Sequence, residues 1–139
     1  MKYMMFIKHA ESHRSMTVPP GLHEAMGEFV TEGFASGMLK ETAGLQATSE
    51  GKRVRLSGGK LQVIDGPFTE AKELVAGFWL WQCKSKEEAI EWLKRAPFED
   101  TEVEIRQVFE TEDFGAQMTP AMREQEERNR VEAARLAQK

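Results

Sequence analysis

The chain has 139 residues, a length typical of one domain, and its 40% hydrophobic and 30% charged residues exclude a wholly disordered or fibrous chain. The net charge of -4 and the single cysteine argue against a nucleic-acid binder, which needs a positive field, and against a disulfide-stapled secreted domain. No segment approaches the ~18 apolar residues of a membrane span. We therefore expect a soluble, cytoplasmic protein with one core and neither nucleic-acid nor membrane partners.

The first predicted elements are a strand, a helix and a second strand. Residues 3–7 form a continuous apolar run, typical of a strand buried on both faces at the centre of a sheet. Pro19 and Pro20 precede an apolar stripe at helical spacing, which predicts a core helix that Gly37 terminates. Residues 39–45 are assigned to a strand on context, because polar residues interrupt their apolar pattern.

A β-hairpin is predicted over residues 53–64. Polar and apolar positions alternate on both sides of a central Gly-Gly pair, which readily takes the positive φ angles of a two-residue hairpin turn. Arg53 and Arg55 share one face of the first strand, and Val54 and Leu56 share the other. One face of the hairpin should therefore be in solvent.

The second half of the domain begins after the turn at residues 65–67. Thr69 can cap a short helix, and residues 78–83 are predicted to form a second buried strand. Ser85 has the capping-box spacing of a second core helix, which stops before Pro97.

A half-solvated strand over residues 102–109 completes the order strand, helix, strand, strand, helix, strand, once the hairpin and short helix are set aside. This is the order of an α+β, ferredoxin-like unit with its helices on one sheet face. A homodimer is the simplest cover for the opposite face. From Pro120 the chain is charged, with Glu-to-Arg spacings that support a helix, so we expect a domain over residues 1–117 and a helical tail over 118–139.

A resemblance to a known family rests on residues 65–73, Asp-Gly-Pro-Phe-Thr-Glu-Ala-Lys-Glu, followed by Gly77 and Phe78. This segment resembles the signature of the DGPF branch of the YCII-related family, and the likeness covers about residues 1–110. The resemblance implies a ferredoxin-like unit that pairs into a dimeric α/β barrel. Four further segments resemble the same branch: residues 1–4, 42–45, 54–56 and 87–89.

The resemblance leaves two functions open. Most DGPF members have no assigned reaction and are often linked by genome context to alternative sigma factors, which implies a small-molecule-binding or regulatory protein with a sigma-factor link. A related YCII branch includes a dehydrochlorinase acting on chlorinated hydroxyhydroquinones, which implies a cofactor-independent enzyme performing proton transfer or elimination on a small aromatic substrate. That branch suggests a His and Asp pair. Asp65 matches the Asp, and His23 matches the histidine after a one-residue shift.

Asp65 is the central candidate residue, although an Asp before Gly-Pro is also what a tight turn requires. His9 ends a predicted central strand, from which its side chain can reach a cleft and transfer protons. We predict that Asp65 lines a cleft near the end of the first strand with His9 and the Arg53 or Arg55 side chain, which would bind an anionic ligand.

The remaining polar candidates have competing structural explanations. Glu70 and Lys72 can contact a ligand if they face a cleft, but mixed charge on a short helix is normally a solvated face. Cys83 ends an apolar run and is interpreted as a small buried hydrophobe. The three histidines are not spaced like a helical metal motif, and we expect neither a metal nor a cofactor.

Overall fold

The computed structural model describes residues 1–9, 20–68, 74–98 and 101–139. It has a mixed α+β fold with antiparallel strands and several helices. The chain divides into two compact units, Met1–Val108 and Phe109–Lys139. The short helix predicted from Thr69 lies outside the described residues.

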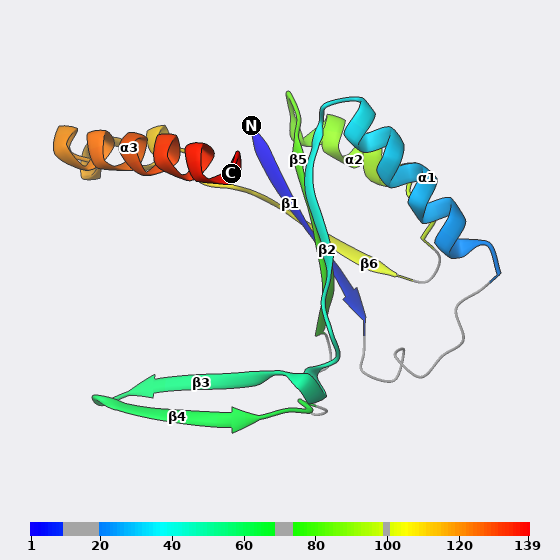
Figure 1. The fold of residues 1–139 in the computed structure, drawn as a ribbon, viewed down its shortest axis with the longest axis horizontal. Helices are drawn as coiled ribbons and strands as arrows, with labels where there is room; N and C mark the ends of the chain where they lie inside the picture. Colours follow the sequence, from blue (N-terminus) through cyan, green and yellow to red (C-terminus); the bar gives the residue numbers. More distant parts are fainter. Residues whose placement is uncertain (10–19, 69–73, 99–100) are drawn as a thin grey trace. The chain divides into compact units, whose positions relative to one another are not determined.

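The first unit contains a four-stranded antiparallel sheet in the order β2-β5-β1-β6 (Figure 1). The prediction of these four strands is confirmed, and the apolar run at the start of the chain is a central strand. The strands are β1 (Lys2–His9), β2 (Leu39–Gly44), β5 (Leu74–Gln82) and β6 (Glu102–Gln107).

Two helices, α1 (Leu22–Ala35) and α2 (Lys86–Lys94), lie on the same side of this sheet (Figure 1). The predicted stop signal is confirmed, because α1 ends two residues before Gly37. The predicted cap of α2 is confirmed as well, because the Ser85 hydroxyl accepts a hydrogen bond from the Glu88 amide at 3.2 Å.

The hydrophobic core lies between these helices and the sheet. Trp79 and Trp81 alternate with outward residues of β5, so both rings point toward the helices and are almost fully buried. The Phe29 ring of α1 lies 5.2 Å and 5.8 Å from them, between ring centroids. The buried cluster contains Tyr3, Met5, Phe29, Leu39, Trp79, Trp81, Cys83 and Ala89.

The other face of the sheet carries a second set of apolar side chains. Met4 and Phe6 of β1 lie opposite Leu80 and Phe78 of β5, and all four are half-buried. The prediction that the first strand is buried on both faces is wrong for the single chain, because α1 and α2 cover only one face. We call the four side chains Met4, Phe6, Phe78 and Leu80 the open sheet face.

The predicted hairpin is confirmed as a separate two-stranded sheet of β3 (Lys52–Ser57) and β4 (Lys60–Asp65). Gly58 and Gly59 form its turn with φ angles of 57° and 75°, which favour glycine. The structure differs from prediction in exposure, since every residue of β3 is exposed. Alternation predicted which side chains share a face, but both faces of β3 are in solvent.

The second unit contains a 3-10 helix, η3 (Thr111–Gln117), and the helix α3 (Pro120–Ala137). The helical tail is therefore confirmed, and none of the residues of α3 is buried. Among the helices that the structure describes, none combines the length and the apolar composition of a membrane span. Ion pairs at helical spacing join Arg128 to Glu124 and Arg130 to Glu126.

Candidate functional site

The Asp-Gly-Pro-Phe motif begins at the last residue of β4 and packs against a 3-10 helix, η2 (Thr48–Glu50). The Gly66 amide donates a hydrogen bond to the Gly51 carbonyl at 3.0 Å. A Cβ atom on Gly66 would lie 1.7 Å from the Thr48 carbonyl oxygen, a distance that no real contact permits. Only glycine therefore fits at the second position of the motif.

The phenylalanine of the motif anchors the same loop. Phe68 is buried, and its amide donates a hydrogen bond to the Thr48 hydroxyl at 3.1 Å. The Arg53 guanidinium carbon lies 4.0 Å from the centroid of the Phe68 ring, which is a cation–π geometry. Gly66 and Phe68 thus hold the base of the hairpin against η2.

Asp65, the first residue of the motif, lies in solvent. Its Oδ1 atom accepts a hydrogen bond from the Nζ atom of Lys52 at 2.5 Å, and the side chains are 74% and 64% exposed. An ion pair this exposed adds little to stability. Sequence reasoning did not pair Lys52 with Asp65. The sequence does indicate this pairing, because both residues lie six positions from the nearer glycine of the hairpin turn and are therefore opposite each other.

The two candidate arginines lie on the other face of the hairpin from Asp65. Arg53 pairs with Ile64, and Arg55 pairs with Gln62, whereas Lys52 pairs with Asp65. Because successive side chains of a strand point to opposite faces, Asp65 and the arginines point in opposite directions. Arg53, Arg55 and Lys60 together form a basic face.

The candidate histidines lie on different elements. His9 is the last residue of β1 and pairs with Leu74, where β5 begins. His23 is exposed in the first turn of α1, and no hydrogen bond or ion pair joins it to Asp65 within the described part of the chain. Glu70 and Lys72 lie outside the described residues.

The open sheet face corresponds to the uncovered face that the element order led us to expect, but none of the candidate site residues lies on it. Successive side chains of β1 and β5 point to opposite faces of the sheet, and this alternation indicates which of them share the open sheet face. No sequence motif marks the four side chains. Phe6 pairs with Glu104 of β6, and Lys8 makes an ion pair with Glu104 at 3.2 Å. An apolar centre with a charged margin is suited to an apolar partner surface or a flat ligand.

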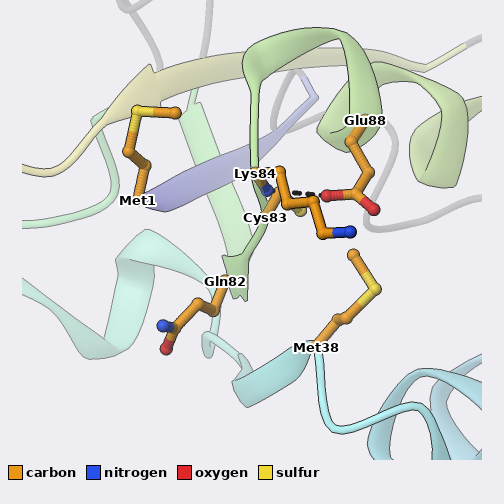
Figure 2. A pocket seen from close by; sticks show the side chains of 6 residues that line it. All are labelled: Met1, Met38, Gln82, Cys83, Lys84 and Glu88. Carbon is orange, nitrogen blue, oxygen red and sulfur yellow. Dashed lines mark hydrogen bonds between the residues drawn. The ribbon is translucent and has the colours of Figure 1, made fainter.

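A pocket of about 260 Å³ lies near the start of β1 and the end of β5 (Figure 2). On its wall the Lys84 amide donates a hydrogen bond to the Glu88 carboxylate at 2.6 Å. Its lining residues are Met1, Met38, Gln82, Cys83, Lys84 and Glu88. Across the described residues, no group of three His, Cys, Asp or Glu side chains could hold a metal ion.

The thiol of Cys83 lines this pocket and is protonated at neutral pH. Burial, and then the Glu88 carboxylate, raises its pKa to about 11, while the positive chain terminus opposes them. The thiolate is the nucleophilic form of cysteine, so the raised pKa disfavours a nucleophilic role for Cys83. The prediction that Cys83 is a small buried hydrophobe is confirmed.

Comparison with known proteins shows that the chain matches a family model and is similar to a bacterial protein. The family model of the YCII-related domain matches residues 1–112, which include both the four-stranded sheet and the hairpin. The uncharacterized protein R00369 of Rhizobium meliloti (strain 1021) is 39% identical over 59 residues. That match covers 42% of this chain and 48% of the relative, so the chain matches about half the relative's length.

Proposed function

Because the chain belongs to the YCII-related family, we propose that it is a homodimeric small-molecule-binding protein of the DGPF branch. One observation carries this proposal. The helices cover one face of the four-stranded sheet, whereas the open sheet face presents four half-exposed apolar side chains. Burial of such side chains against the same face of a second copy stabilises a dimer.

The finer architecture proposed here is a ferredoxin-like unit that pairs into a dimeric α/β barrel. The strand order β2-β5-β1-β6, with α1 after β1 and α2 after β5, supports the ferredoxin-like topology. Sheets that face each other pack ~10 Å apart. Aromatic and aliphatic side chains lining such a space suit a small, flat, largely apolar ligand.

The motif loop supplies the polar part of the proposed site. Asp65 has an exposed carboxylate that can accept a hydrogen bond from a ligand hydroxyl. The pairing of His9 with Leu74 supports a place for His9 in the same site, since the motif loop precedes β5 in the chain. Arg53 or Arg55 would hold an anionic group of a ligand that extends around the hairpin edge. The resemblance to the DGPF branch also favours a regulatory role beside a sigma factor.

The second candidate is a cofactor-independent enzyme that moves a proton or eliminates a leaving group from a small aromatic substrate. The position of His9 at the end of a central strand favours it. A carboxylate such as Asp65 would orient this histidine and raise its pKa. The ion pair between Asp65 and Lys52 favours the binding function instead, because it already neutralises the carboxylate.

Hydroquinone tests the binding function, with 1,4-dimethoxybenzene as a matched compound that lacks hydroxyl donors. Binding to the folded chain raises the unfolding temperature in proportion to ligand saturation. The proposal predicts a rise with hydroquinone and a smaller one with the ether. Equal effects, or no effect of either compound, would contradict a site that uses the Asp65 carboxylate. Conversion of hydroquinone derivatives carrying a leaving group would favour the enzyme.

A further inference from the structure

The two faces of the β-hairpin differ sharply in chemistry. Strand register places the cross-strand pairs Val54–Val63 and Leu56–Leu61 on one face. These side chains are 55%, 51%, 75% and 64% exposed, in that order. We call these four residues the hairpin apolar face. The basic side chains Arg53, Arg55 and Lys60 lie on the opposite face.

An exposed aliphatic face is unfavourable for an isolated two-stranded ribbon. Two strands without a third strand or a helix against them are marginally stable in water. In the described part of the chain, β3 and β4 pair only with each other. A contiguous exposed apolar patch on such an element is typical of an interaction surface.

We propose that a second copy of this chain covers the hairpin apolar face, with the hairpin of each copy docked on the remainder of the other. This inference rests on the proposed homodimer and adds a second contact region to it. The Lys52–Asp65 ion pair at the base of the apolar face is neutral, so the face can enter an interface without an unpaired charge.

The net charge of the hairpin favours the remainder of the second copy, rather than the second hairpin, as the surface that receives it. Residues 52–65 carry four positive side chains and one negative side chain, a net charge of +3. Since the whole chain carries -4, subtraction of this +3 leaves -7 on the remainder. Two hairpins would repel each other, whereas a hairpin and the remainder of a second chain attract.

The area required by a stable dimer supports reciprocal docking. A specific interface buries ~800 Å² on each partner, more than four aliphatic side chains supply. In a two-fold dimer each copy contributes its own hairpin face and the surface that receives the partner's hairpin, so the contact occurs twice. The open sheet face then supplies the rest of the interface.

The test compares two double variants by sedimentation of the full chain. Leu56→Ser with Leu61→Ser removes the larger pair of the hairpin apolar face without touching the core. We expect the dissociation constant of the dimer to rise at least about tenfold, because the variant loses the apolar contacts that both leucines would make with the second copy. Val131→Ser with Leu136→Ser is the matched control, since these α3 side chains are 59% and 52% exposed. The control should leave the dimer unchanged.

A cross-link distinguishes the proposed arrangement from pairing between hairpins. Oxidation of a Leu56→Cys variant should give little disulfide-linked dimer, because the two hairpins lie apart. Efficient cross-linking would overturn docking on the remainder of the chain. Dimerisation of the serine variant with unchanged affinity would overturn the hairpin contact and leave the proposed homodimer standing. A monomeric wild-type chain would contradict the homodimer itself.

Discussion

The Nζ atom of Lys52 lies 2.5 Å from the Oδ1 atom of Asp65 across the base of the hairpin. Both side chains are mostly exposed, and such pairs contribute ~0–1 kcal/mol to stability. The backbone of the motif is held instead by Gly66 and Phe68. The charge of Asp65 therefore contributes little to folding.

Asp65→Asn should separate the structural role of Asp65 from its proposed role in ligand binding, because the variant keeps the shape of the side chain and removes its charge. We expect the free energy of unfolding in urea to change by less than about 1 kcal/mol. Hydroquinone affinity should fall about tenfold, because hydrogen bonds to charged groups contribute ~1.5–3 kcal/mol. Lys52→Gln is the matched control that breaks the ion pair and keeps the carboxylate. Unchanged hydroquinone affinity in Asp65→Asn would remove Asp65 from the site.

Gly66→Ala should destabilise the fold strongly, by more than about 2 kcal/mol, because the new methyl group would collide with the Thr48 backbone. Gly27→Ala is the control, since a Cβ there meets no atom within 4 Å and lies inside α1. That control should stabilise the chain by up to about 1 kcal/mol. Urea unfolding of both variants measures the difference. Equal stability of the two alanine variants would show that the loop does not pack as described.

Cys83 should make stability fall at alkaline pH. Burial raises its pKa from the ordinary value of 9.0 to about 11 in the folded chain, so the folded state retains the proton more strongly than an exposed thiol does. The resulting stabilisation is complete below about pH 9 and is lost as the pH rises through about 11, an effect of up to about 3 kcal/mol. Cys83→Ala should lose less stability over the same interval. Parallel pH profiles for wild type and Cys83→Ala would contradict the elevated pKa.

Removal of residues 109–139 should leave a folded chain, because Met1–Val108 is a compact unit that contains the buried core cluster of the described residues. Thermal unfolding of the shortened chain, followed by circular dichroism, should remain cooperative. Within the second unit, the rings of Phe109 and Phe114 lie 5.1 Å apart between centroids in a tilted arrangement, and Arg123 donates a hydrogen bond to the Gly115 carbonyl. If the shortened chain shows no cooperative transition, residues 109–139 are part of the core.

Local patterns predicted the elements of the fold well. The apolar run at residues 3–7, the Ser85 cap and the Gly58–Gly59 turn each determine a structure within a few neighbouring residues. Glu-to-Arg spacings likewise marked α3.

Contacts between distant segments could not be predicted in this way. The fit of Gly66 against Thr48 joins residues that share no periodic pattern. Alternation placed Val54 and Leu56 on one face of a strand, but it cannot show whether another element covers that face. Asp65 was singled out by its motif, whereas its ion-pair partner Lys52 became apparent only from the strand register.

Sedimentation velocity of the full chain at micromolar concentrations tests the central proposal most directly. The wild type should sediment as a species of twice the 15.8 kDa chain mass. The Leu80→Lys variant should be a folded monomer, because in a dimer its charge on the open sheet face would be buried without a partner. Circular dichroism verifies that this variant is folded. A wild-type chain that sediments only as a monomer, or a Leu80→Lys variant that remains fully dimeric, would contradict the proposed homodimer.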